Sequence, residues 1–328
     1  MSSSADTPWT RVAVAVSDGD DPFHHLAVES ALMGVAVERR IPCLFFYVNR
    51  LCVVWGKHQN PWLECDLARA EAEGAQTVRR FSGGGTVAQD PGNLNFAIAM
   101  PREWHQPDRN MNILIGALRA IGVPASCHLR VGLAADGFKF SGQSFSLRGR
   151  AALHHGTLLV ASDLDRIRRL LAAPPADART HAIRSIPSPM RNLSDIRPGL
   201  GMDELREALL RGFLDAWHRP EAERWTADDL RRLETAHEEA RYRTWDWRFG
   251  ETPDFQWSWN EGGLAWSAEA GAGVLRRLDS NPPGHAHPRW RPGDRLPESG
   301  LPPLPDAGSG RPADRGLDIQ AGSGRLKG

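Results

Sequence analysis

The order of apolar segments along residues 11–160 is the feature that most limits how this chain can fold. Short runs rich in β-branched and aromatic residues come in pairs, and single helical stretches separate the pairs. We expect strands at 11–16, 43–50, 51–56, 77–81, 93–100, 138–147 and 151–160, with 43–50 and 51–56 joined tightly at Asn49-Arg50. Helices are expected at 21–39, 63–74, 114–121, 163–172, 203–217 and 227–240. This pattern predicts an α+β fold, a largely antiparallel sheet with flanking helices.

The composition changes near Tyr242, which suggests a domain boundary. Residues 245–270 are rich in Trp and turn residues, and we interpret them as a small β unit with one hairpin at 255–275. From Asn281 onward, 18 of 48 residues are Pro or Gly, above the roughly 25–30% that marks low-complexity segments. We therefore divide the chain into domains at 1–241 and 242–280 and a disordered Pro/Gly-rich tail at 281–328.

The bulk composition excludes several classes of function. The 40 basic residues balance the 40 acidic ones, which argues against nucleic-acid or anionic-membrane partners. No apolar run reaches the roughly 20 residues of a membrane span, and the first residues lack the features of an export signal. The four cysteines have no metal-ligand spacing, so we expect no metal site and a reducing, cytoplasmic setting. No unexplained apolar helix face stands out, and we expect a monomer.

The first candidate site is the glycine run in Arg79–Thr86, with the sequence RRFSGGGT. Glycines let the backbone come close to a ligand, and exposed N–H groups there can bind an anion. Two preceding arginines could neutralise phosphate or carboxylate. A flexible turn is an equal alternative, and the P-loop pattern is absent.

The second candidate is Lys139, in the apolar stretch FKFSGQS. Only three of the 40 basic residues are lysines: Lys57, Lys139 and Lys327. A lysine retained in the interior of the chain suggests a role that needs a compact charge on a slim side chain. Arginine cannot provide such a charge. Lys139 could bridge an acyl carboxylate and the α-phosphate of ATP; an edge-strand lysine facing water is the alternative.

Two pairs of adjacent histidines complete the candidates. His154 and His155 lie on a predicted strand and point to opposite faces, so they do not chelate one metal together. We expect one of them to be buried and hydrogen-bonded and the other exposed. His24 and His25 at the start of the first helix receive the same interpretation.

Taken together and in order, these segments resemble the lipoate–protein ligase family. RRFSGGGTVAQDPGNLNF (79–96) is similar to its RR-x-SGGG-x-V-x-HD-x-GN signature, KFSGQSF (139–145) to K-x-SG-x-A, and HHGTLL (154–159) to its HHGTLL strand. FFYVNRLCVVWGKHQNPWLECD (45–66), residues 188–193 and WDWRFGETPDF (245–255) match further segments. The resemblance covers roughly residues 10–275. It implies a class II-synthetase-like biotin/lipoate ligase catalytic domain followed by an accessory domain, here truncated.

The resemblance also implies roles for individual residues. Lys139 is the catalytic residue, and it contacts both the acyl carbonyl and the phosphate. The nucleotide-binding residues it implies are Arg80, Gly85, Thr86, Val87, Ala88 and Lys139. The residues it implies for binding the acyl substrate are Ser82, Gly83, Gly84, Asn93, Ser141, Gly142, His155 and Gly156. Trp55, Phe81, Leu94 and Phe96 are candidates for lining the acyl tunnel, although ordinary core positions are the commoner fate of such residues.

The family reaction uses ATP and Mg²⁺ to convert lipoate or octanoate to an acyl-adenylate, then acylates a lysine. The partners it implies are apo lipoyl domains of 2-oxoacid dehydrogenase complexes or the glycine cleavage H protein. Three departures from the family bear on this. Gln89 replaces the usual His, Arg130-Val131-Gly132 replaces Arg-Asn-Asp, and the accessory domain is short, which puts the activation step in question.

Two alternatives remain open at this point. One is a transferase that uses a preformed acyl donor, with a thioester on Cys127 as one route; the simpler interpretation of Cys127 is a small buried hydrophobic residue. The other is a non-catalytic protein that binds a lipoyl domain.

Overall fold

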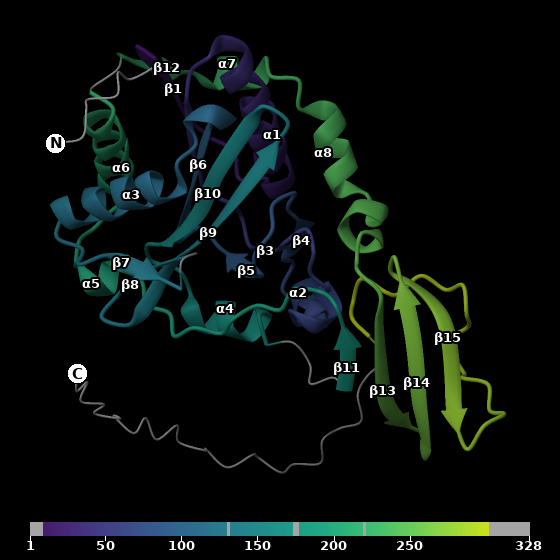
Figure 1. Cartoon of the computed structure of the whole chain (residues 1–328). Helices are drawn as coiled ribbons and strands as arrows, with labels where there is room; N and C mark the ends of the chain where they lie inside the picture. The colour runs from purple at the N-terminus through teal and green to yellow at the C-terminus, as the bar shows by residue number, and fades with distance from the viewer. Residues whose placement is uncertain (1–8, 130–131, 173–176, 219–220, 302–328) are drawn as a thin grey trace, which may run out of the picture.

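The computed structural model describes residues 9–129, 132–172, 177–218 and 221–301, which form a larger α+β body and a smaller β unit (Figure 1). An eight-stranded sheet forms the middle of the larger body, in the order β12-β1-β2-β6-β10-β9-β8-β7. Its strands are β1 (Arg11–Val16), β2 (Cys43–Tyr47), β6 (Asn93–Pro101), β7 (Ser126–His128), β8 (Gly132–Ala135), β9 (Phe138–Arg148), β10 (Ala151–Leu159) and β12 (Glu221–Trp225). β1 pairs in parallel with β2 and β12, and the other five pairings are antiparallel. The predicted α+β fold with a largely antiparallel sheet is confirmed.

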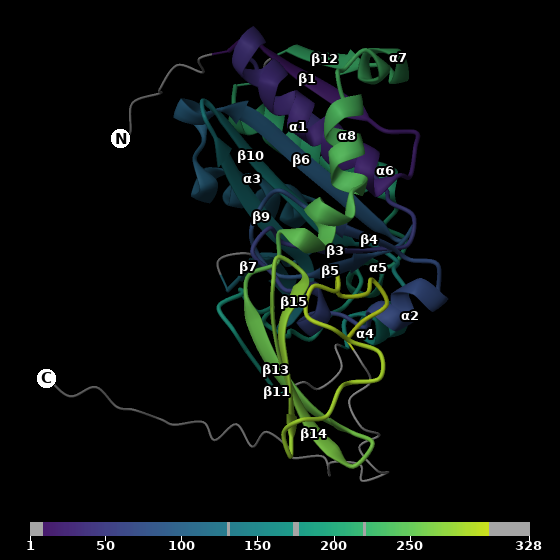
Figure 2. The same ribbon diagram turned by 90° about the vertical axis from the view of Figure 1, so that its right-hand side faces the viewer.

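Helices cover both faces of this sheet (Figure 2). Alternation along β6 sends Phe96, Ile98 and Met100 toward α3 (Pro107–Ala120) and α6 (Met202–Ala216), and sends Ala97 and Ala99 toward α1 (Pro22–Arg39). The small alanine side chains let α1 lie close to the strand. The short helices α5 (Leu193–Ile196) and α7 (Ala227–Arg231) and the helical turn η2 (Arg102–Trp104) complete the larger body.

A second, three-stranded sheet lies next to the first and carries the glycine loop. Its order is β4-β3-β5, from β3 (Cys52–Trp55), β4 (Gln76–Arg79) and β5 (Val87–Gln89). The turn η1 (Pro61–Leu63) and the helices α2 (Leu67–Ala72) and α4 (Leu164–Leu170) pack around it. The two strands expected over 43–50 and 51–56 are both present and follow each other closely, but they do not pair. Both edges of β2 are occupied, by β1 and β6, so β3 cannot pair with it and enters the other sheet.

The helix expected over 227–240 is two helices, because the chain turns between Arg232 and Thr235. α7 ends at Arg231 and α8 (Ala236–Arg243) begins after Thr235. Leu230 is buried and Leu233 packs against the same core, which anchors the turn. α8 runs along α1 toward the small β unit (Figure 1), and the boundary expected at 241–242 falls within α8.

The small unit is larger than the single hairpin expected at 255–275. β13 (Phe255–Glu261), β14 (Leu264–Gly271) and β15 (Val274–Asn281) form an antiparallel meander after the turn η3 (Asp246–Gly250). β11 (Asp177–Thr180), from the larger body, adds a fourth strand beside β13. Alternate residues Phe255, Trp257 and Trp259 point into the core that the two bodies share.

The disorder expected over 281–328 is wrong for residues 282–301. This segment returns over the small sheet, where the Leu296 N–H donates to Gly273 O at 2.8 Å and the Trp62 indole donates to Pro297 O at 2.8 Å. Leu296 is 1% exposed. The Trp-rich sheet face needs an apolar cover, and these contacts outweigh the Pro/Gly composition that predicted disorder. Residues 302–328 of the expected tail lie outside the described residues.

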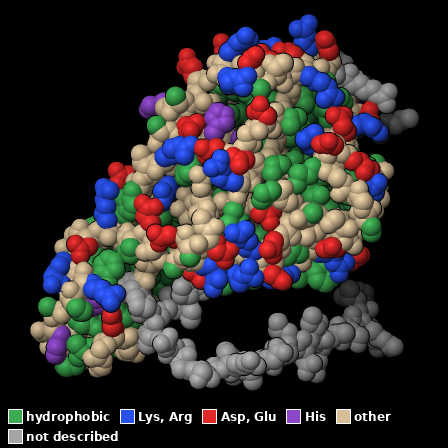
Figure 3. Space-filling model, turned by 180° about the vertical axis from the view of Figure 1, so that it is seen from behind, with side chains coloured by type: hydrophobic (Ala, Val, Ile, Leu, Met, Phe, Trp, Pro, Cys, Tyr) green, Lys and Arg blue, Asp and Glu red, His purple; other side chains and the backbone are tan. Residues whose placement is uncertain are grey.

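The surface agrees with the balanced composition. Figure 3 shows acidic and basic side chains interspersed over one face of the molecule. Among the residues that the structure describes, no helix combines the length and apolar character that a membrane span requires.

Candidate active site

A cavity of about 290 Å³ lies between the two sheets of the larger body. One end is formed by Gly85, Thr86, Gly132, Lys139 and the segment 183–188; Pro22, Leu26, Tyr47, Asn49 and Gln89 form the other. Arg80, Gly84, Val87, Gly142, Gln143, His155 and Gly156 are among the residues between them. At the end that contains Lys139, backbone atoms and charged side chains make up much of the wall. At the end that contains Pro22 and Leu26, the wall is more apolar.

The glycine loop is held from inside by Arg80. Its guanidinium donates to the carbonyls of Gly83, Gly85 and Val54 and to Ser82 Oγ. Burial lowers the Arg80 pKa to about 10. Gly84 has φ +85°, and a Cβ there would lie 3.0 Å from the Arg80 guanidinium, so the loop requires glycine at this position. In this structure Arg80 shapes the loop rather than presenting free donors.

Lys139 projects from β9 into the cavity wall. Its own backbone is fixed, because Lys139 N–H donates to Pro189 O and Lys139 O accepts from Arg191 N–H. A Cβ on Gly132 would lie 3.4 Å from Lys139 Cε and 2.8 Å from Ser141 O, so the glycine at 132 makes room for the lysine stem. Burial, together with the nearby Arg80 charge, lowers the Lys139 pKa. Within the described residues, its ammonium has no hydrogen-bond or ion-pair partner.

Behind the glycine loop runs a buried chain of polar side chains. Ser82 Oγ lies 2.7 Å from His155 Nε2, and His155 Nδ1 lies 2.8 Å from Glu29 Oε2. The Tyr47 hydroxyl donates to Glu29 Oε1 at 2.8 Å. Glu29 is fully buried, and its carboxylate is one reason why the pKa of Tyr47 is raised, after burial itself. The chain ties α1, β2 and β10 to the loop.

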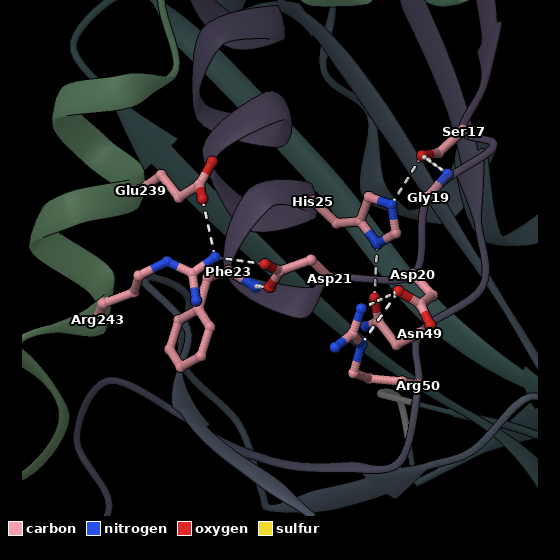
Figure 4. A network of polar contacts seen from close by, with 10 residues as sticks. All are labelled: Ser17, Gly19, Asp20, Asp21, Phe23, His25, Asn49, Arg50, Glu239 and Arg243. Carbon is pink, nitrogen blue, oxygen red and sulfur yellow. Dashed lines mark hydrogen bonds and ion pairs between the residues drawn. The ribbon is translucent and has the colours of Figure 1, made fainter.

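A second chain ends at Gln89. Asn49 Nδ2 donates to Gln89 Oε1 at 2.6 Å, and His25 Nδ1 lies 2.6 Å from Asn49 Oδ1. Figure 4 shows His25 between Asn49 and Ser17, beside the N-terminus of α1. Gln89 is thus connected to a buried histidine on α1.

The segment 183–188 closes the charged end of the cavity. The Thr86 N–H donates to Ser185 Oγ at 2.8 Å, and Gln59 Nε2 donates to the same hydroxyl at 3.0 Å. Glu64 accepts from Ser185 N–H at 3.0 Å. The predicted anion-binding amide of Thr86 is therefore occupied by a serine hydroxyl, which a phosphate oxygen would have to replace.

The structure brings most of the predicted site residues to one cavity. The residues in its wall are Arg80, Gly84, Gly85, Thr86, Val87, Lys139, Gly142, His155 and Gly156. Five others do not line it. Ala88 faces the core behind β5, Ser82 and Gly83 support the loop, and Asn93 and Ser141 are buried beside their own strands. Ligand contacts for all of these residues remain predictions.

Other predicted positions proved structural. Trp55, Phe81, Leu94 and Phe96 are buried in the hydrophobic cores and do not line the cavity, so they have the ordinary core role that was given as the commoner fate of such residues. His154 and His155 are both buried, against the expectation that one is exposed, because helices cover both sheet faces.

Cys127 is exposed on the short edge strand β7, not buried as its simpler interpretation expected, and it does not line the cavity. Of the Arg130-Val131-Gly132 departure, only Gly132 is described.

Arg79 was missed as a structural residue by the sequence analysis. Its fully buried side chain donates to the carbonyls of Lys57, Gln59 and Arg248 and to Thr252 Oγ1. Burial lowers the Arg79 pKa to about 9. The adjacent Arg80 faces the cavity side, so one arginine holds the glycine loop and the other holds the small β unit.

Metal-binding geometry is absent from the part of the chain that the structure describes. No three His, Cys, Asp or Glu side chains there could together hold an ion. The described cavity wall contains no carboxylate, so a hard cation would find mainly amide and hydroxyl oxygens in it.

At one cavity the fold brings together a glycine loop and a lysine that has no partner among the described residues, an arrangement suited to binding an anionic substrate. The family model of the lipoyl protein ligase A/B catalytic domain matches residues 21–214. The chain is 30% identical over 257 residues to lipoate-protein ligase A of Bdellovibrio bacteriovorus, covering 76% of each chain. This chain belongs to the lipoyl protein ligase A/B family and is an enzyme of the lipoate–protein ligase class.

Solved structures show the same fold. P. falciparum LipL1 in complex with lipoate superposes with a TM-score of 0.65 at 22% identity, over 82% of this chain and 84% of that one. A lipoate-protein ligase A bound with ATP superposes with a TM-score of 0.61 at 25% identity, over 73% of this chain and 98% of that one. The predicted family membership is confirmed.

Proposed function

We propose that this enzyme joins lipoate or octanoate to a specific lysine of an apo lipoyl domain through an acyl-adenylate. The observation that carries the proposal is the ammonium of Lys139, half-buried in the cavity wall and without a partner among the described residues. A desolvated cation of this kind is stabilised when an anion binds beside it. The lipoate-bound and ATP-bound relatives support both substrates.

In the first step, a carboxylate oxygen of the acyl acid attacks the α-phosphorus of ATP. A new acyl O–P bond forms, the bond to the β-phosphate oxygen breaks, and pyrophosphate leaves. The Lys139 ammonium and the N–H groups of Gly85 and Thr86 offset the negative charge that develops there. Mg²⁺ would be held mainly by the phosphates of ATP, since the described cavity wall offers amide and hydroxyl oxygens but no carboxylate, and it would offset negative charge on those phosphates.

In the second step, the neutral ε-amine of the acceptor lysine attacks the acyl carbon. The C–N bond forms, the C–O bond to phosphate breaks, and AMP and a proton leave. The more apolar end of the cavity, at Pro22 and Leu26, receives the acyl chain. Burial of that chain supplies most of the acid's binding energy, about 0.8 kcal/mol for each buried CH₂.

The test is the intact mass of an apo lipoyl domain after incubation with this enzyme. One tube contains lipoate and MgATP, and a second contains premade lipoyl-AMP instead. We expect the added lipoyl mass in both tubes. Apo H protein of the glycine cleavage system provides a second acceptor.

The other outcomes separate the alternatives. Modification in the adenylate tube alone identifies a transferase that has lost activation, consistent with the short accessory unit. No modification in either tube, with lipoyl-domain binding retained, identifies a non-catalytic binder and refutes the proposal. Repeating both tubes with Cys127→Ser tests the thioester route, which requires that variant to be inactive.

A further inference from the structure

Gln89 is a polar residue in the part of the cavity that receives the acyl chain. On β5, Val87 and Gln89 both line the cavity, whereas Ala88 between them faces the core. Val87 Cγ1 lies 3.7 Å from the Cβ position of Gly142, and Lys139 Nζ lies 3.6 Å from the same point. Val87 therefore marks the charged end of the cavity.

The spacing along β5 places Gln89 at a defined depth. Two residues of a strand span roughly 6.6 Å, which is about the reach of five or six C–C bonds in a partly extended chain. An acyl acid whose carboxyl group lies at Lys139 thus brings its sixth or seventh carbon to Gln89. Pro22 and Leu26 are the apolar residues of this part of the wall, whereas Val54 pairs with Val87.

The orientation of the Gln89 amide is fixed by its neighbours. Its Oε1 accepts from Asn49 Nδ2 at 2.6 Å, and Asn49 is held in turn by His25, whose Nε2 lies 2.8 Å from Ser17 Oγ. Gly19 N–H donates to the same Ser17 hydroxyl at 3.1 Å. Because Oε1 is turned to Asn49, the other amide atom, Nε2, is left for the cavity. It has no partner within the described residues.

Surface ion pairs hold this arrangement from outside. Asp21 caps α1 at Phe23 N–H and pairs with Arg243 of α8, and Asp20 pairs with Arg50, next to Asn49 (Figure 4). The helix end that carries His25 and the turn that carries Asn49 are thereby tied in place.

We propose that Gln89 determines acyl specificity by directing its Nε2–H at the acyl chain near the sixth carbon. An acid with a hydrogen-bond acceptor there, such as the ring sulfurs of lipoate, is favoured over an unsubstituted acid such as octanoate. An alkyl chain covers the N–H without accepting from it and so leaves a buried donor unsatisfied. Sulfur is a weak acceptor, so the preference is moderate. The inference rests on the proposed function.

The test compares kcat/KM for lipoate and for octanoate, measured as pyrophosphate release, in wild type and Gln89→Met. Methionine keeps the length of the side chain and removes the donor. We expect the lipoate-to-octanoate ratio to fall by about five- to tenfold, mainly through better use of octanoate. A ratio within about twofold of wild type overturns the proposal. If Gln89→Met does not fold, Gln89→Glu, which keeps the acceptor for Asn49, is judged by the same criterion.

Two adjacent histidines provide a matched control for the positioning role of His25. His25→Leu breaks the chain to Gln89, whereas His24→Leu removes the contact with Glu239 and a ring contact with His25 but leaves the bonds of His25 to Asn49 and Ser17 in place. The ratio of two substrates is independent of the amount of folded enzyme, so simple destabilisation does not move it. His25→Leu is expected to lower the ratio and His24→Leu to leave it unchanged; equal ratios in both refute the positioning role.

Binding of the two free acids without ATP separates this inference from the proposed function. If wild type binds both acids but releases no pyrophosphate, the proposed function fails. The role of Gln89 is then decided by whether Gln89→Met changes the ratio of the two dissociation constants.

Discussion

At the scale of single residues, the cavity depends on charges that water no longer solvates. Arg80 satisfies its donors on loop carbonyls, while Lys139 is left without a partner among the described residues. The two cations therefore differ in function. Carbonyl dipoles stabilise the charge of Arg80, which holds the backbone of the glycine loop. The charge of Lys139 is available to an incoming anion.

Replacement of Lys139 by alanine is expected to abolish acyl-adenylate formation with little effect on folding. Loss of one positioned charge in a buried site costs about 100-fold or more in kcat, and the side chain makes no polar contact in the described structure. Pyrophosphate release measures the loss. Lys57→Ala is the matched control, because Lys57 is not in the cavity wall. Comparable rates for Lys139→Ala and wild type would exclude the charge-bridging role.

The lowered pKa of Lys139 predicts opposite effects of pH on rate and stability. The protonated amine is the active form, so the adenylation rate should fall as pH rises through a value below the ordinary 10.5. Between the folded and unfolded pKa values, the unfolded chain binds the extra proton, so the free energy of unfolding should increase with pH. The difference between wild type and Lys139→Met, measured by urea unfolding across pH 8–11, isolates this contribution. A difference that does not depend on pH contradicts the shifted pKa.

At the scale of elements, the small β unit and the cavity are mechanically connected. β11 is a strand of the small sheet, and the chain continues from Thr180 directly into the segment 183–188 that borders the cavity. On the other side, Trp55 Nε1 and Arg79 Nε both donate to Arg248 O, at 3.2 and 2.8 Å. The small β unit is therefore attached to the larger body at two places. The attachment through Arg79 leads to the glycine loop, and the attachment through β11 leads to the segment 183–188.

Arg79→Met is expected to lower the free energy of unfolding by about 3 kcal/mol or more. The substitution leaves the buried carbonyls of Gly56, Lys57, Gln59 and Arg248 without this donor, at about 1–3 kcal/mol for each one left unsatisfied. Urea unfolding measures the change. Arg69→Met, at a half-exposed ion pair on α2, should change stability by no more than about 0.5 kcal/mol. Equal effects of the two substitutions would show that Arg79 does not anchor the unit.

At the scale of the whole molecule, residues 282–301 complete a core that spans both bodies. Leu296 and Trp290 pack against the cluster that contains Trp62, Phe249 and Trp259. Glu298 pairs with Arg248. The Pro/Gly-rich segment thus covers one face of the small unit and connects it to the larger body.

A chain that ends at Asn281 should be less stable than one that ends at Leu301. The shorter chain loses the buried Leu296 and the Trp62–Pro297 hydrogen bond, which together contribute about 3 kcal/mol. The longer chain keeps every contact described here. Thermal unfolding and limited trypsin digestion at Arg276 and Arg277 compare the two. Identical melting and digestion of both truncations would mean that the segment does not support the core.

Local patterns in the sequence predict the secondary-structure elements and the candidate site residues that lie close together in the chain. Period-two alternation predicts most strands of the main sheet. The sequence alone also makes the glycine run, Lys139 and the histidine strand candidates for the site. These features are local, because alternation, glycine freedom and the rarity of lysine can each be read within a few residues.

Which residues far apart in the sequence come into contact depends on the tertiary structure. The edges of β2 were already occupied, so β3 joined another sheet. Pro/Gly-rich residues became ordered because a Trp-rich face needed cover. Glu29 entered the site through packing of α1 against the sheet, with no signal in its immediate sequence, and the same packing brought His25 to Asn49. Burial, hydrogen-bond satisfaction and the pKa of a charge depend on every element around it, and a linear pattern contains none of that information.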